Sequence, residues 1–132
     1  MTHLKINEFV TGIYKTGKYI GELTNENDIS YVVRILAVLK HPVQGDLHHP
    51  KQVNQGFFHE RKALAFREQA NIPKTMVKPF QGEIPNYQDS LHHTFHELLS
   101  TLQQGDSIYA QKSIETLRSI QREYELMYNM TF

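Results

Sequence analysis

The spacing of the apolar residues changes near Gly82, and this change limits the folds that the chain can adopt. Before Gly82 apolar and polar residues alternate, as in half-buried strands, and after it apolar residues recur every third or fourth position, as on one side of a helix. We therefore expect an α+β fold, with a β domain in residues 1–82 and an antiparallel helical hairpin in residues 83–132 that packs on this domain or extends from it. A chain of 132 residues is long enough to bury a core without disulfide bonds.

The composition excludes several classes of site. These 132 residues contain no cysteine, and so no disulfide, thiolate metal ligand, cysteine nucleophile or cysteine-linked lipid. Residues 1–82 hold 11 Lys/Arg and 7 Asp/Glu, whereas residues 83–132 hold 3 and 7, which gives charges of +4 and −4 with histidine neutral. Charges this small do not indicate nucleic-acid binding, which needs a dense basic stripe. We interpret the two parts as electrostatically compatible neighbours. No apolar run has the length of a signal peptide or a membrane span, so we expect a cytoplasmic protein without direct membrane insertion.

Three strands are expected in the first 40 residues. Glu8–Tyr14 and Tyr19–Thr24 are rich in β-branched and aromatic residues, and a tight turn with Gly17 at positive φ joins them. Gly21 predicts a bulge or a sharp bend inside the second strand. Ile29–Lys40 is apolar on both faces, so we expect a strand that is either central or bent so that its two halves serve two sheets, as in small barrels.

A long irregular stretch, Pro42–Gly56, separates these strands from the rest of the β domain. We expect a strand that starts at Phe58 or Arg61 and ends at Gln69, then a break at Asn71–Thr75, then a short strand at Met76–Phe80.

The segment Ala70–Lys78 looks like the closing turn of an SH3 domain, in which a strand runs into Ile-Pro, makes one 3₁₀ turn and enters a last short strand. Together with the long middle strand, it predicts a small SH3-like β-barrel. The chain has no Trp and no Ala-Leu-Tyr-Asp-Tyr segment, and Met76 stands where the groove tyrosine would be. We therefore do not expect recognition of proline-rich peptides.

Two helices follow. Asn86 is placed to cap the first, with Asp89 against its positive end, and Gly105 is expected to end it at positive φ. Asp106 or Ser107 is expected to cap the second. The two apolar stripes are Leu91, Phe95, Leu98, Leu99 and Leu102, then Ala110, Ile114, Leu117, Ile120, Tyr124, Met127 and Tyr128.

Eight histidines raise the question of a metal site. His92 and His96 have the i, i+4 spacing that places two imidazoles on one ion, with Glu97 or Asp89 as a third ligand, which would make the chain a metal-dependent hydrolase. The competing interpretation is a solvated surface, since His93 and His96 point away from the leucine stripe and His92 lies at its margin. We favour the solvated surface and expect no metal.

The long loop offers Asp46 and His48 as an acid/base pair, and Phe57 and Phe58 as adjacent aromatics. Catalysis needs a larger constellation, so we expect a structured loop and no catalytic residue. Neighbouring strand residues point to opposite faces, so one phenylalanine is expected to cover the hairpin or to form an exposed contact.

A nucleic-acid-binding SH3-like barrel is a further alternative. Its surface would combine Phe66 and Tyr19 with basic residues on or near the last strands. We favour a solvated face or one that meets the acidic hairpin, and so expect no nucleic-acid partner. The basic residues are Arg61, Lys62, Arg67, Lys74 and Lys78.

Two stretches carry a family resemblance. One is Val10–Glu22, and the other is Ala37–Gln52, which continues through Phe57–Gln69 to Val77–Lys78. Together they resemble kinase-associated protein B of spore-forming Bacillus-type bacteria, a family described as a lipoprotein. The resemblance implies an SH3-like barrel with a helical tail. It also implies a non-enzymatic role, helping to activate a membrane sensor histidine kinase that feeds the sporulation phosphorelay.

From this resemblance we expect a cytoplasmic accessory protein that meets the sensor histidine kinase at the inner face of the membrane and uses no cofactor. The expected contact residues are His48, His49, Phe57 and Phe58. The sequence does not decide the oligomeric state and leaves a homodimer open.

Overall fold

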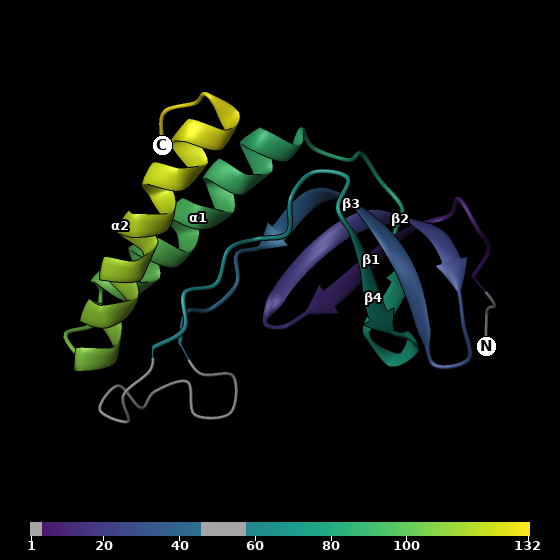
Figure 1. Ribbon diagram of the computed structural model, residues 1–132, viewed down its shortest axis with the longest axis horizontal. Coiled ribbons are helices and arrows are strands. Elements are labelled where there is room, and N and C mark those ends of the chain that lie inside the picture. The colour runs from purple at the N-terminus through teal and green to yellow at the C-terminus, as the bar shows by residue number, and fades with distance from the viewer. Residues whose placement is uncertain (1–3, 46–57) are drawn as a thin grey trace.

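In the computed structural model, residues 4–45 and 58–132 are described. A five-stranded antiparallel sheet occupies one end of the molecule and two antiparallel helices occupy the other (Figure 1). The strands run in the order β4-β3-β2-β1-β5. The expected α+β fold is confirmed. Among the described residues β4 and β5 are the two edges and no ladder joins them, so a closed barrel is not confirmed. The strands are β1 (Phe9–Tyr14), β2 (Gly17–Glu26), β3 (Ser30–Lys40), β4 (Gln69–Pro73) and β5 (Val77–Pro79).

The β1–β2 turn uses Lys15 and Thr16 at positive φ, 49° and 81°. The sequence-based prediction of positive φ at Gly17 is therefore wrong. Glycine is needed there for a different reason, because a Cβ at Gly17 would lie 2.5 Å from the Tyr19 hydroxyl oxygen. Tyr19 is buried and fills the space that a side chain at Gly17 would enter.

The bulge predicted at Gly21 is confirmed, since the register of β2 against β3 shifts between Ile20 and Gly21. A Cβ at Gly21 would lie 2.5 Å from the Arg34 carbonyl oxygen. The two strands approach so closely here that only glycine fits.

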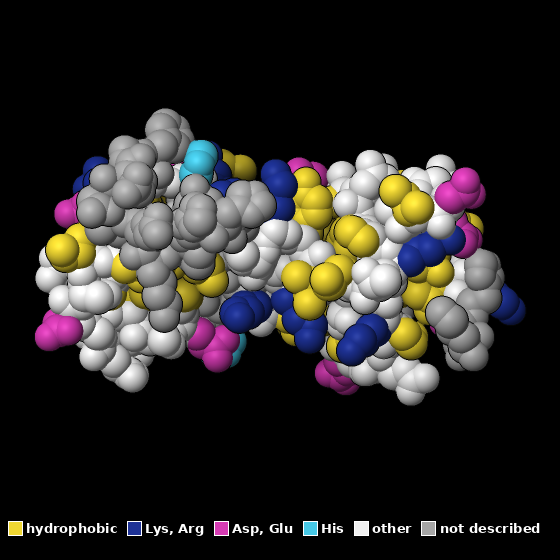
Figure 2. Space-filling model, turned by 90° about the horizontal axis from the view of Figure 1, so that it is seen from below, with side chains coloured by type: hydrophobic (Ala, Val, Ile, Leu, Met, Phe, Trp, Pro, Cys, Tyr) yellow, Lys and Arg dark blue, Asp and Glu magenta, His cyan; other side chains and the backbone are white. Residues whose placement is uncertain are grey.

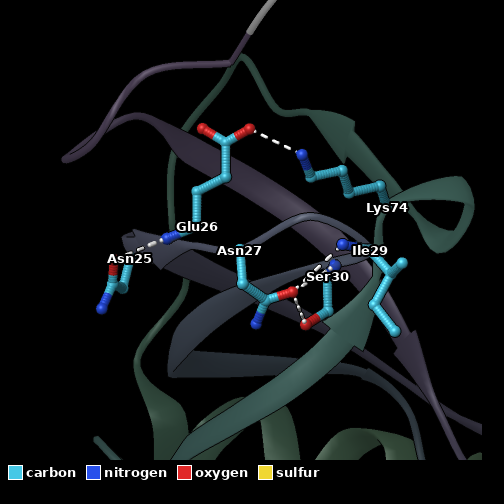
Figure 3. A network of polar contacts seen from close by, with 6 residues as sticks. All are labelled: Asn25, Glu26, Asn27, Ile29, Ser30 and Lys74. Carbon is cyan, nitrogen blue, oxygen red and sulfur yellow. Dashed lines mark hydrogen bonds and ion pairs between the residues drawn. The ribbon is translucent and has the colours of Figure 1, made fainter.

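The β2–β3 turn is held by an asparagine side chain (Figure 3). The Asn27 Oδ1 accepts hydrogen bonds from the backbone N–H groups of Ile29, at 3.1 Å, and Ser30, at 2.9 Å. Beside it, the Lys74 ammonium lies 2.7 Å from the Glu26 carboxylate and ties the 3₁₀ turn η1 (Lys74–Met76) to β2. The 3₁₀ turn expected between the last two strands is thus present.

The prediction of a strand that ends at Gln69 is wrong, because residues 58–68 are irregular and β4 begins at Gln69. Tyrosine hydroxyls take backbone N–H groups that a sheet ladder would have used. The Tyr124 hydroxyl accepts from Ala63 N–H at 2.8 Å, and the Tyr19 hydroxyl accepts from Leu64 N–H at 3.2 Å. The break expected at Asn71–Thr75 therefore begins later than predicted, because β4 continues to Pro73.

The helices are α1 (Tyr87–Gln103) and α2 (Ile108–Tyr128). The predicted caps are confirmed: the Asn86 side chain accepts from Asp89 N–H, and the Ser107 side chain accepts from Ala110 N–H. Gly105 does not have positive φ, and the C-cap of α1 is Gln104 in the right-handed region, so that prediction is wrong.

The helix α1 covers the part of β3 that β4 leaves unpaired. The β3–β4 ladder ends at Arg34, and further along β3 the Val38 N–H donates to the Ser90 hydroxyl of α1 at 2.9 Å. One hydrophobic cluster joins the sheet to both helices, and its helical members include Leu91, Phe95, Leu99, Leu117, Ile120 and Tyr124. Met127, expected in the stripe of α2, is 57% exposed. Neither helix of the described residues has the length and apolarity to cross a membrane.

Candidate partner-binding surface

The two ends of the long loop are joined at the loop base, which we define as residues 41–45 and 58–65. These segments run side by side from the sheet toward the helices (Figure 1). The Gln44 amide connects them: its oxygen accepts from Arg61 N–H and its nitrogen donates to the Arg61 carbonyl, both at 2.8 Å. Gly45 N–H also donates to the His59 carbonyl at 2.8 Å. Gln44 is 1% exposed, so the hydrogen bonds that hold the loop base are shielded from water.

A buried imidazole links the loop base to α2. The His41 Nδ1 lies 3.0 Å from the Pro42 carbonyl oxygen, which only accepts, so this nitrogen carries the hydrogen. The Nε2 then accepts from the Tyr124 hydroxyl at 2.9 Å. Burial lowers the pKa of His41 to about 4. His41 is therefore a neutral structural residue at physiological pH, and it joins the end of β3 to the hairpin.

Phe58 is the one described member of the four predicted contact residues. It is half-buried and its ring packs against Tyr109 of α2, with the ring centroids 6.0 Å apart. The Tyr109 hydroxyl donates to the Gln44 carbonyl at 2.9 Å, so this contact belongs to the loop base. Of the two options for the adjacent phenylalanines, Phe58 is the one that covers the hairpin. The other predicted contacts, His48, His49 and Phe57, lie outside the described residues, as does Asp46.

The histidines of α1 lie in an aromatic cluster with the last residue. The rings of His92 and His96 are 4.5 Å apart, and the Phe132 ring lies 5.3 Å and 6.2 Å from them. His96 is half-buried, so its placement on a solvated surface is wrong, and burial lowers its pKa, with further contributions from His92 and Arg118. Within residues 4–45 and 58–132, no three His, Asp or Glu side chains come together to hold a metal ion.

The basic residues considered for nucleic-acid binding do not form one surface with Tyr19. Tyr19 is 1% exposed, and Lys62 pairs with Glu123 at 3.0 Å. Lys74 pairs with Glu26, and the Arg61 Nε donates to the Gly45 carbonyl at 2.9 Å. On the face drawn in Figure 2, the Lys and Arg side chains over the sheet are separated by apolar groups.

A groove runs between the end of β3 and the exposed side of α1, and we call it the α1 groove. It consists of two adjoining hollows of about 640 and 450 Å³ that share Leu39, Thr94 and Glu97. One end reaches His41 and Val43, so the groove adjoins the loop base. Sequence reasoning missed this groove. The available signal was Leu39, an apolar residue at the end of its strand, which is 38% exposed.

The profile of the family Kinase associated protein B matches residues 14–125. The chain belongs to the kinase-associated protein B family. The resemblance drawn from the sequence is thus confirmed, and the matched segment includes α1, most of α2 and both sides of the loop base.

Two members of the kinase-associated protein B family show how far the similarity extends. Kinase-associated lipoprotein B of Bacillus subtilis (strain 168) is 48% identical over 124 residues, which are 94% of this chain and 97% of that protein. The crystal structure of kinase-associated protein B from Bacillus cereus is similar with a TM-score of 0.80 and 49% identity, covering 93% of this chain and 99% of that one.

Proposed function

We propose that this chain is a non-enzymatic accessory protein that binds a sensor histidine kinase feeding the sporulation phosphorelay and raises its activity. The observation that carries the proposal is family membership across residues 14–125. The names of the two similar proteins associate them with a kinase, and they match nearly the whole chain. An activator must bind the active state of the kinase more tightly than the inactive state. The proposed place of action is the cytoplasmic face of the membrane, reached through the kinase.

The buried polar groups of the loop base support a binding role. His41, Gln44 and Tyr124 are each 1% exposed, and each uses its polar atoms in hydrogen bonds that hold the chain in place. These hydrogen bonds restrict the motion of the loop base, and a rigid surface loses less conformational entropy when a partner binds.

We also propose that residues 1–82 form an SH3-like barrel on which the hairpin of residues 83–132 packs. The strand order and the 3₁₀ turn before β5 support this architecture. So does a contact beyond the ladders: a Cβ at Gly12 of β1 would lie 2.7 Å from the Ile72 side chain of β4. The first and fourth strands therefore face each other across the sheet interior.

The experiment measures autophosphorylation of the purified cytoplasmic part of the kinase with and without the full chain. We expect the chain to bind the kinase and to increase the rate. The sequence-based contact residues are tested by the variant H48A/H49A/F57A/F58A, with thermal unfolding to confirm its fold, because Phe58 also packs on Tyr109. The control is I29A/L126A, which changes residues that are 80% and 85% exposed elsewhere. Unchanged activation by the quadruple variant would remove these four residues from the contact, and no binding by the native chain would refute the function.

A further inference from the structure

The polar side chains at the floor of the α1 groove are already hydrogen-bonded within the protein. Ser90 and Thr94 line it, and both are buried. The Ser90 hydroxyl donates to the Tyr87 carbonyl at 2.7 Å and accepts from Val38 N–H, while the Thr94 hydroxyl donates to the Ser90 carbonyl at 2.7 Å. These short side chains are satisfied internally, so a partner can approach α1 closely without stranding a hydrogen-bonding group.

The apolar part of the groove follows one side of α1. Leu39 at the end of β3 lines both hollows, Leu98 of α1 lines the larger one, and the α1 lining extends from Asp89 to Thr101. At 1.5 Å per residue these positions span about 18 Å, the length of about three helical turns. Exposed leucine beside a groove of this length fits the mode in which an amphipathic helix lays its apolar face between two walls.

The two walls carry opposite charge. Lys18 and Lys40 are neighbours in the β2–β3 register and both are exposed, so two like charges stand side by side. Within the described residues neither of them pairs with an acidic side chain. Like charges opposite each other on a sheet repel, and a carboxylate placed between them would relieve that repulsion. On α1, Glu97 lines the same hollow as these lysines and Asp89 lines the adjoining smaller hollow, and both are exposed.

We propose that the α1 groove binds an amphipathic helix of the kinase, with its apolar side on Leu39 and Leu98 and its acidic residues beside Lys18 and Lys40. The assignment of the kinase as the source of this helix rests on the proposed function. The charge of the walls sets the orientation, because acidic residues of the incoming helix favour the lysine wall and are repelled by Asp89 and Glu97. The groove adjoins the loop base at Val43, so one partner can cover both.

The test measures the Kd between the full chain and the cytoplasmic part of the kinase for two variants, L39E and K18E/K40E. We expect each to raise Kd by at least about tenfold, since each replaces a central contact of the groove with a repulsive charge. Matched controls are L126E, at an 85% exposed leucine on α2, and K5E/K112E, which makes the same change in net charge at exposed lysines outside the groove. These controls are expected to bind within about twofold of the native chain. Thermal unfolding verifies that every variant is folded.

The outcomes separate the groove from the function. If the native chain binds the kinase and both groove variants bind equally well, the groove assignment is overturned and the proposed function stands. If the native chain does not bind, the proposed function fails, and the kinase helix with it. If L39E instead converts a dimer of this chain to a monomer in sedimentation analysis, the occupant is a second copy and the proposal is overturned. A photo-crosslinker at position 101 that captures the kinase, while one at position 126 does not, would support the groove directly.

Discussion

Replacing Tyr124 with phenylalanine removes one oxygen atom from the centre of the loop base. That oxygen accepts from Ala63 N–H at 2.8 Å and donates to His41 Nε2 at 2.9 Å. Tyr124 and His41 are each 1% exposed, so no water replaces the lost partner without rearrangement. The variant leaves two buried groups unsatisfied, the Ala63 N–H and His41 Nε2, at about 1–3 kcal/mol each, so it should lose about 2–6 kcal/mol of the free energy of unfolding. For a domain of this size the expected fall in Tm is about 6–24 °C.

The assay is urea unfolding followed by circular dichroism, with an m-value that stays unchanged if the unfolded state is unaffected. The control is Y109F, because Tyr109 donates only one hydrogen bond, to the Gln44 carbonyl, and is half-buried. Its expected cost is about 0.5–1.5 kcal/mol. If Y124F is within about 0.5 kcal/mol of the native chain, the tyrosine hydroxyl does not hold the loop base and the reasoning is refuted.

Three further predictions follow from the same structure. Because burial lowers the pKa of His41 from 6.5 to about 4, the free energy of unfolding should fall by about 3 kcal/mol as pH falls from 6.5 to 4. The variant H41Q should lack this fall, which is measured by subtracting its pH profile of urea unfolding from that of the native chain. G21A should destabilise the chain by about 1–3 kcal/mol in thermal unfolding, because its Cβ would lie 2.5 Å from the Arg34 carbonyl oxygen. The control G105A, whose Cβ would lie 3.7 Å from its nearest neighbour atom outside the adjacent residues, should be neutral or stabilising, and equal values for the two variants would contradict the close approach of β2 and β3. F132A should raise the pKa of His96 in an NMR titration, because it exposes the imidazole to water, and an unchanged pKa would show that the Phe132 ring does not shield it.

Several features of the fold could be predicted because their causes are local in sequence. The caps at Asn86 and Ser107 each act on an N–H three residues ahead, and the bulge at Gly21 follows from a missing Cβ inside a strand. The helical stripes required only a period. The family resemblance likewise depended on consecutive residues, and it is confirmed over residues 14–125.

Other predictions failed because the deciding partner is distant in sequence. The strand expected before Gln69 does not form, since the hydroxyls of Tyr19 and Tyr124 take the N–H groups of Leu64 and Ala63. Gly17 was expected to serve a turn, but it makes room for the Tyr19 ring. His96 was expected on a solvated surface, but it is half-buried beside the Phe132 ring.

The sequence alone determined which segments are helical, where the helices begin and which family the chain resembles, because these properties depend on residues that are neighbours along the chain. Only the tertiary structure decided that His41 is neutral and structural, that Phe58 rests on Tyr109, and that Leu39 borders a groove that Lys18 and Lys40 also line. The physical reason is that burial and charge at these positions are set by α1 and α2, which lie tens of residues away in sequence and reach them only after the hairpin packs on β3.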